Sequence, residues 1–305
     1  MSINQINIAT RKSKLALWQA HFVKAALQKE HPHLKITLIP MTTEGDEAQS
    51  ESLKNKGGKS LFVKALQEAL LTKKADIAVH SIKDMSVQET KGLMLAAVCA
   101  REDARDAFIS KKYHYLSDLP KNAILGTASP RRESLVRAIR PDLHIKLLRG
   151  NIDTRLKKLD NDEYDAIILA TAGLNRLGLR ARIQSHFSVE TFTPAIGQGA
   201  MGVECRSDDI AIKKIVQCLH HEPTALCVAA ERAVNQVLKG DCHSPIGAYA
   251  YIAHAQLHLH AMVGSLDGKI ILNTYQCGDV SDAVMLGELA AKQLLKDGAA
   301  TLLRE

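Results

Sequence analysis

Two hydrophobic periodicities follow one another along the chain, and together they predict short strands that alternate with amphipathic helices. Strands are expected at residues 6–10, 35–40, 75–80, 123–125, 145–148 and 166–170, and helices at 14–29, 60–71, 130–139 and 154–159. Ser13 is expected to cap the first helix, and the strand at 166–170 is expected to break at Ala172-Gly173. This alternation predicts an α/β fold with mainly parallel sheets and helices on both faces.

Segments 73–80 and 163–170 share one pattern. In each, polar residues and an Asp come first, a buried strand follows, and a loop with charged residues comes after the strand. Two similar α/β lobes would produce this repetition. The glycine-rich segment 197–204 is expected to cross back into the first lobe. We therefore expect lobe 1 at residues 1–99 and 200–217, and lobe 2 at residues 105–193.

The pattern changes after residue 222. A helix and a loop come first, followed by hairpin-like strands at 248–252, 254–263 and 270–275 and a last helix at 282–295. Residues 222–305 are therefore expected to form a small α+β C-terminal domain with an antiparallel sheet.

The composition is that of a folded protein, with 46% hydrophobic and 24% charged residues. No apolar run reaches the length of a membrane span, and the first residues do not resemble a secretory signal. We therefore expect a cytoplasmic protein that does not bind membranes. Its six cysteines contain no CxxC pair, which favours free and mostly buried thiols.

The net charge of +7 is distributed unevenly. From residue 222 onward there are six Lys/Arg and nine Asp/Glu, which leaves 34 against 24 in the preceding part. This excess favours an anionic ligand held by the two lobes, although scattered surface charge would give the same count. Nucleic acid is not expected as a partner, because aromatic residues make up only 4% of the chain.

Four loops combine a strand end with hydroxyl groups and arginines, the groups that bind carboxylates at a helix N-terminus. They are found at 11–13, 126–132, 149–155 and 176. Any one of them could be an ordinary helix cap with a solvated charge. Because ligands bind beyond the carboxyl ends of strands in open α/β sheets, four such loops together indicate a site for a polyanion.

Two other patterns do not support a nucleotide or metal site. Gly57-Gly58-Lys59-Ser60 lacks the earlier glycine of a phosphate-binding loop, where Leu53 stands, and is interpreted as a basic loop able to close over a cleft. His254, His258 and His260 are expected on one strand face together with Gln256. Without carboxylates or cysteines at suitable spacing, a polar sheet face is favoured over a metal site, so no metal is expected.

Two further positions carry candidate chemistry. Lys83 and Asp84 follow a buried strand, where a carboxylate could stabilise a developing cation or move a proton, or form a plain exposed ion pair. Cys242 lies in a loop punctuated by glycine and proline, and is the cysteine most suited to react. It is either a structural thiol or a covalent anchor for a ligand in the arginine-lined site.

At this point the chain resembles one family, the porphobilinogen deaminases, also called hydroxymethylbilane synthases. The motifs that carry the resemblance run in order over almost the whole chain. They are Ile8-Ala9-Thr10-Arg11, Gly57-Gly58-Lys59, 76–81 with Lys83-Asp84, Arg101-Glu102-Asp103, Gly126-Thr127, Arg131-Arg132, 148–151 with Thr154-Arg155, 195–200, and Cys242 with Pro245-Ile246-Gly247.

The resemblance implies two lobes like those of type II periplasmic binding proteins, a third domain, and a monomer. It implies a dipyrromethane cofactor joined to Cys242 by a thioether. On this primer four porphobilinogen molecules are condensed head to tail with loss of ammonia, and hydroxymethylbilane is released by hydrolysis for tetrapyrrole (heme) biosynthesis. Every pyrrole carries an acetate and a propionate, which would account for the arginine loops.

The resemblance also assigns roles to residues. Asp84 contacts the pyrrole nitrogens and stabilises the cationic intermediate, and Lys83 is the second catalytic residue. Besides Cys242, Asp84 and Lys83, the cofactor-binding residues are Thr127, Ser129, Arg131 and Arg132. The substrate-binding residues are Arg11, Ser13, Lys59, Arg149, Arg155, Arg176 and Gln198.

The chain departs from the family pattern at three positions. Glu44 stands where relatives often have a basic or neutral residue, Pro130 replaces a leucine-like residue, and Asp241 replaces a glycine before Cys242. A carboxylate beside the cysteine should slow attachment of the cofactor. The alternative function is a non-catalytic, two-lobed protein that binds small anions, which would leave the Cys242 loop without a purpose.

Overall fold

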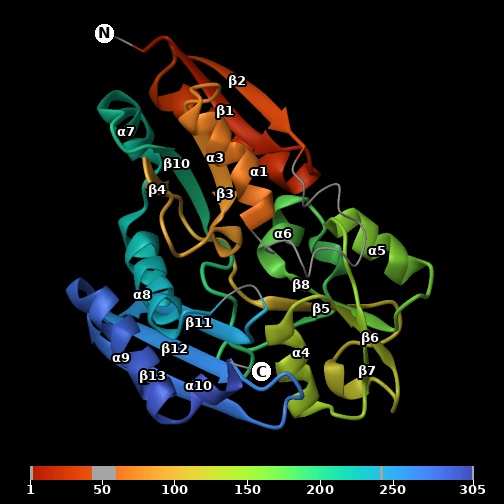
Figure 1. Cartoon of the computed structure of the whole chain (residues 1–305). Helices are drawn as coiled ribbons and strands as arrows, with labels where there is room; N and C mark the ends of the chain where they lie inside the picture. The colour runs from red at the N-terminus through yellow and green to blue at the C-terminus, as the bar shows by residue number, and fades with distance from the viewer. Residues whose placement is uncertain (1–2, 43–59, 241–242, 304–305) are drawn as a thin grey trace. The chain divides into compact units, whose positions relative to one another are not determined.

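The computed structural model in Figure 1 describes residues 3–42, 60–240 and 243–303, without the side chains of residues 60–62. The chain divides into two compact units. One contains Met1–Glu102 and Ala200–Ala225, and the other contains Asp103–Gly199 and Leu226–Glu305. The chain therefore leaves the first unit after Glu102, returns to it at Ala200 and leaves it again after Ala225. The expected division into three domains stays a prediction.

The first unit is built on a five-stranded sheet in the order β2-β1-β3-β10-β4. The strands are β1 (Gln5–Arg11), β2 (Lys35–Met41), β3 (Ile77–Ser81), β4 (Leu93–Val98) and β10 (Met201–Arg206). β1 is parallel to β2 and β3, whereas β10 is antiparallel to both β3 and β4. The segment after Gly199 does cross back into the first sheet, as the sequence predicts.

Helices cover both faces of this sheet because successive strand residues point to opposite sides. Ile8 and Val79 pack with α1 (Lys14–Glu30) and α7 (Ile210–Val216) on one face. Their neighbours Ala9 and Ala78 pack with α3 (Ser60–Leu71) on the other. Short 3₁₀ turns follow β3 (η2, Ile82–Asp84) and α7 (η5, Gln217–Leu219).

The second unit contains a sheet of the same design, in the order β7-β6-β8-β5-β9. Its strands are β5 (Asp106–Ser110), β6 (Ile124–Thr127), β7 (His144–Leu147), β8 (Ala166–Ala170) and β9 (Ser185–His186), and its helices are α4 (Pro130–Ile139), α5 (Ile152–Asp160) and α6 (Thr171–Arg176). β6 is parallel to β7 and β8, and β5 is antiparallel to β8 and β9. Two similar α/β lobes are therefore confirmed, with four strands of each sheet running one way and one strand reversed.

The same unit holds an antiparallel sheet of β11 (Ile246–Ala253), β12 (Gln256–Gly264) and β13 (Ile271–Asp279). One face of this sheet is covered by α8 (Glu222–Leu238), α9 (Ala283–Lys296) and α10 (Ala299–Leu302). Met262 of β12 belongs instead to the core around Leu135 and Val136 of α4, so the two sheets of this unit share packed side chains. The expected small antiparallel sheet is confirmed.

The strand at 166–170 ends at Ala170 as predicted. Residues 171–176 then form α6, which the sequence did not predict; a glycine costs a helix only about 1 kcal/mol, so the buried Gly173 does not prevent it. One local prediction is wrong. His254 lies in the turn before β12 with φ of 51°, so it does not share the strand face of His258.

The prediction of mostly buried thiols is confirmed for the described cysteines. Cys99, Cys205 and Cys227 are buried, whereas Cys218 and Cys277 are exposed. Cys277 lies on the outward face of β13, and Cys218 lies in η5 at the surface.

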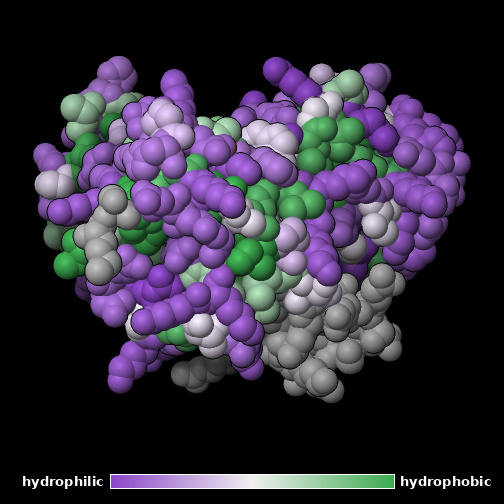
Figure 2. Space-filling view, turned by 90° about the horizontal axis from the view of Figure 1, so that it is seen from above, coloured by the Kyte–Doolittle hydropathy of each residue, from purple (hydrophilic) through white to green (hydrophobic). Residues whose placement is uncertain are grey.

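The surface seen in Figure 2 is mainly hydrophilic, with hydrophobic side chains gathered between the polar ones. Among the described residues, no helix combines the length and the apolar character that a membrane crossing requires.

Candidate active site

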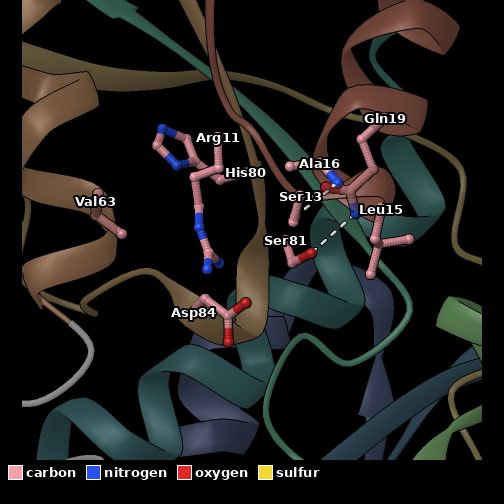
Figure 3. A pocket seen from close by; sticks show the side chains of 9 residues that line it. All are labelled: Arg11, Ser13, Leu15, Ala16, Gln19, Val63, His80, Ser81 and Asp84. Atoms are coloured by element: carbon pink, nitrogen blue, oxygen red, sulfur yellow. Dashed lines mark hydrogen bonds between the residues drawn. The ribbon is translucent and has the colours of Figure 1, made fainter. Parts of the chain in front are cut away.

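A pocket in the first unit gathers several residues that the sequence singles out (Figure 3). Its empty volume is about 410 Å³, part of which is open to solvent. The lining residues are Arg11, Ser13, Leu15, Ala16, Gln19, Val63, His80, Ser81 and Asp84. The structure thus brings Arg11, Ser13 and Asp84 together, although 73 positions of sequence separate the first from the last.

The pocket lies where two parallel strands end. β1 ends at Arg11, and Ser13 caps α1 by accepting a hydrogen bond at Oγ from the Ala16 N–H (3.3 Å). β3 ends at Ser81, and the η2 turn then carries Lys83 and Asp84. Since β1 and β3 are neighbouring parallel strands, their carboxyl ends place these groups at one edge of the sheet.

Within the pocket, Gln19 Nε2 donates to Ser81 Oγ (2.9 Å), which ties α1 to the end of β3. Sequence reasoning did not select Gln19, although a polar residue on the buried face of a helix was a usable signal. The half-buried Asp84 carboxylate shares this pocket with the Arg11 guanidinium and the N-terminus of α1. Lys83 is also half-buried but does not line the pocket. Lys59 lies outside the described residues, as does Glu44.

A second group of predicted residues lies in the other unit, at the junction of β6 and α4. Ser129 caps α4, with Oγ accepting from the Arg132 N–H (3.5 Å), and the Ser129 N–H donates to Thr127 Oγ1 (3.1 Å). Pro130, the departure from the family pattern, occupies the first helical position. A proline is favourable there because that N–H has no partner inside the helix.

The double arginine of this junction is buried and paired with one carboxylate, Asp106. Arg131 Nη2 lies 2.7 Å from Asp106 Oδ2, and Arg132 Nε and Nη2 lie 3.0 and 2.7 Å from Oδ1. Gln198 Nε2 also donates to Oδ1 (3.0 Å) and to the Ala104 carbonyl (2.7 Å). Sequence reasoning missed Asp106, although an Asp opening an apolar strand indicates a buried partner.

The charges of this cluster explain its electrostatics. Burial alone would raise the pKa of Asp106, but Arg131 and Arg132 outweigh it and lower the pKa to about 2. For Arg131, burial lowers the guanidinium pKa while the charge of Asp106 opposes the change. Arg131 Nη1 donates to the Thr193 carbonyl (2.7 Å), and its buried Nε has no hydrogen-bond partner in the part of the chain that the structure describes.

The remaining predicted arginines follow the other parallel strands of the same sheet. Arg149 comes after β7 and is half-buried. Arg155 donates from Nε to the Gly150 carbonyl (2.7 Å), and the buried Arg176 donates from Nη2 to the Gly199 carbonyl (2.7 Å). Thus the cationic groups of this unit also follow the carboxyl ends of β6, β7 and β8.

Comparison with known proteins identifies the family. Residues 6–214 match the family described as porphobilinogen deaminase, dipyromethane cofactor binding domain, and residues 225–296 match porphobilinogen deaminase, C-terminal domain. The chain belongs to the porphobilinogen deaminase family. Curated porphobilinogen deaminases of Coxiella burnetii, from strains Dugway 5J108-111 and RSA 493, are 52% identical over 300 residues, covering 98% of this chain and 97% of theirs.

Membership in the porphobilinogen deaminase family makes this chain a transferase, a hydroxymethylbilane synthase with a domain that binds the dipyrromethane cofactor. The family assignment disfavours the alternative of a non-catalytic anion-binding protein.

Among solved structures, the chain is similar to a putative methionine-binding lipoprotein of Bacillus subtilis (15% identity, TM-score 0.47, 72% of this chain and 92% of that chain). Another is a periplasmic substrate-binding protein of an ABC transporter from Coxiella burnetii (15% identity, TM-score 0.46, 74% and 96%).

The described residues fit the cofactor of a porphobilinogen deaminase. Its pyrrole carboxylates need cationic or N–H donors, and the buried Arg131 Nε–H is a donor without an acceptor among the described residues. Cys242, the expected attachment point, lies outside the described residues together with Asp241. At Gly240, which precedes these two residues, an added Cβ would contact Ile246 Cδ1 and Asn235 Oδ1, so both side chains would have to shift.

The histidines on β12 belong to an aromatic surface of the sheet. His258 stacks on Tyr251 (ring centroids 4.8 Å apart, planes 8° apart) and lies 2.6 Å from the Tyr275 hydroxyl through Nδ1. His260 packs against Tyr275, 5.0 Å away. These contacts support the interpretation as a polar sheet face.

Proposed function

We propose that Asp84 performs the charge-stabilising step of the synthase reaction in the pocket of the first unit. Loss of ammonia from porphobilinogen leaves positive charge on the methylene-pyrrole group. A carboxylate at the carboxyl end of β3, held beside the Arg11 guanidinium, would stabilise that charge and accept hydrogen bonds from pyrrole N–H groups. The position of Asp84 in this pocket is the observation that carries the proposal.

The carboxylates of the pyrroles would be bound by the cationic and hydroxyl groups at the strand ends. Arg11, at the N-terminus of α1 with Ser13, suits a carboxylate because the helix dipole adds to its charge. The further carboxylate-binding residues of the proposal are Lys83, Thr127, Ser129, Arg131, Arg132, Arg149, Arg155 and Arg176. Lys59 and Gln198 are its further substrate-binding residues. Because Arg131, Arg132 and Gln198 already bind Asp106, they would contribute to a ligand from a preset geometry.

Cys242 would hold dipyrromethane through a thioether. When bound, dipyrromethane supplies the pyrrole α-carbon on which four porphobilinogens are joined. The protein would act as a cytoplasmic monomer with porphobilinogen as its partner, and with neither nucleic acid nor a membrane.

Asp84→Asn tests the catalytic assignment, because the amide keeps the size of the carboxylate and removes its charge. We expect turnover to fall by about 10²-fold or more, the order lost with one electrostatic contact in an enzyme. The matched control is Asp160→Asn, which removes an exposed carboxylate outside the pocket, paired with Arg182 at 2.6 Å. Near-normal turnover of Asp84→Asn in protein carrying dipyrromethane would refute the role of Asp84.

Cys242→Ser tests the anchor by intact mass spectrometry with peptide mapping. We expect the variant to lack the pyrrole mass that the native chain carries at Cys242. A covalently bound dipyrromethane elsewhere on the variant would contradict the assignment.

A further inference from the structure

A buried histidine in the wall of the pocket is paired with a buried glutamate. His80 of β3 lines the pocket, and its Nε2 lies 3.1 Å from Glu204 Oε2 of β10. Both side chains are 4% exposed. Glu204 faces Ala78 across the antiparallel pair, which puts it diagonally next to His80 on the α3 side of the sheet.

Two more side chains fix the orientation of Glu204. The Thr90 hydroxyl donates to Gln67 Oε1 (3.1 Å), and Gln67 Nε2 donates to Glu204 Oε1 (2.8 Å). Gln67 therefore presents its N–H₂ group, and Glu204 acts as an acceptor. Because Glu204 accepts, its hydrogen bond with His80 requires the imidazole proton on Nε2.

The second ring nitrogen of His80 is then available to the pocket. Nδ1 has no hydrogen-bond partner among the described residues. It is also not fully buried, because the fully buried polar atoms that lack a partner in the described part of the chain are Arg131 Nε, Ser134 Oγ, Thr171 Oγ1 and Asn175 Oδ1. It therefore reaches the open space next to Arg11 (Figure 3). A neutral imidazole with its proton on Nε2 carries a lone pair on Nδ1, so it accepts hydrogen bonds there.

We propose that His80 is a further substrate-contacting residue, whose Nδ1 accepts a hydrogen bond from an N–H group of porphobilinogen. Glu204, oriented by Gln67 and Thr90, is the positioning residue that holds the required tautomer. This inference rests on the proposed role of the pocket. It adds an acceptor for N–H donors to a site whose other groups, apart from Asp84, suit carboxylates.

Two substitutions of His80 separate substrate contact from structural support. Asparagine places an oxygen at the position of Nδ1 and loses the contact with Glu204, whereas glutamine keeps a donor for Glu204 and loses the acceptor in the pocket. We expect His80→Gln to raise KM for porphobilinogen about 3- to 10-fold, the value of one hydrogen bond. His80→Asn should stay within about twofold of the native KM. The reverse order would show a structural role and overturn the proposal.

The tautomer is measured directly in the ¹⁵N-labelled full chain carrying dipyrromethane, by long-range ¹H–¹⁵N correlation of the histidine rings. His220 is an internal reference, because it accepts from the Val98 N–H at Nδ1 (3.3 Å) and lies 2.9 Å from Glu222 through Nε2. We expect the same pattern for His80, with its signals assigned by their loss in His80→Asn. A proton on Nδ1 of His80 would overturn the proposal.

Glu204→Gln and Glu222→Gln form the matched pair of acid variants. Glu204→Gln should raise KM as His80→Gln does, and Glu222→Gln, which alters a His–Glu pair outside the pocket, should leave it unchanged. An unchanged KM in Glu204→Gln would refute the positioning role. Asp84→Asn, measured alongside, shows which of the two proposals fails. If Asp84→Asn retains turnover, the assignment of the active site is wrong. If Asp84→Asn loses turnover but the His80 variants keep the native KM, only the inference about His80 is wrong.

Discussion

Replacing Asp106 by asparagine should strongly destabilise the second unit. The side chain keeps its size but loses the charge that offsets Arg131 and Arg132, whose side chains are 3% and 7% exposed. Removing one partner of a buried ion pair costs about 3–5 kcal/mol, because the remaining charge is left without compensation in a medium of low dielectric constant. We therefore expect the free energy of unfolding of the unit that contains α4 to fall by an amount in this range.

The same pair makes stability depend on pH. Because the folded-state pKa of Asp106 is lowered from 3.8 to about 2, its contribution is present in full above pH 4 and is lost as the pH falls toward 2. The difference corresponds to about 2 kcal/mol.

Hydrogen–deuterium exchange of peptides covering α4 measures this effect within the unit. A loss of 3 kcal/mol would reduce protection about 10²-fold. The control is Glu133→Gln on the same helix, which breaks the half-exposed pair with Arg137 and should cost about 0.3–0.5 kcal/mol. If Asp106→Asn changed protection no more than Glu133→Gln does, the reasoning about the buried charges would be wrong.

Other features of the structure give two further expectations. Gly287→Ala should lower the free energy of unfolding by about 1–3 kcal/mol, and with it the melting temperature, because its Cβ would clash with the Ala230 carbonyl where α9 crosses α8. An unchanged melting temperature would contradict this close packing. Brief alkylation at pH 8 followed by peptide mapping should label Cys277 before Cys218, whose thiol pKa is raised by partial burial and by the charge of Glu30. Cys205 should be spared, because burial raises its pKa to about 11. Early labelling of Cys205 would show that β10 opens readily.

Local signals in the sequence were sufficient for the elements and for one part of the site. Ser129 and Pro130 define the start of α4, and Ser13 that of α1, because caps act within a few residues. The strand ends place Arg11 and Asp84 in one pocket for a similarly simple reason, since neighbouring parallel strands end at the same edge.

Partners distant in sequence could not be predicted in this way. Asp106 lies 25 positions before Arg131, and Glu204 lies 124 positions after His80, so only the folded sheets bring each pair together. The reversed strand in each lobe has the same origin: periodicity identifies a strand but does not reveal its direction or its neighbours. Roles that the family assigns to Lys83, Arg149 and the other site residues stay predictions.

The insertion of β10 between β3 and β4 sets an order of events during synthesis. About 100 residues separate the end of β4 at Val98 from the start of β10 at Met201, and most of them form the α/β lobe of the other unit. At roughly 5–20 residues per second, a ribosome needs about 5–20 s to make them. During that interval β3 and β4 have no strand between them, and His80 has no Glu204. The first lobe to be translated is therefore the last to be completed, and its pocket acquires its buried acid only when the returning strand pairs with the sheet.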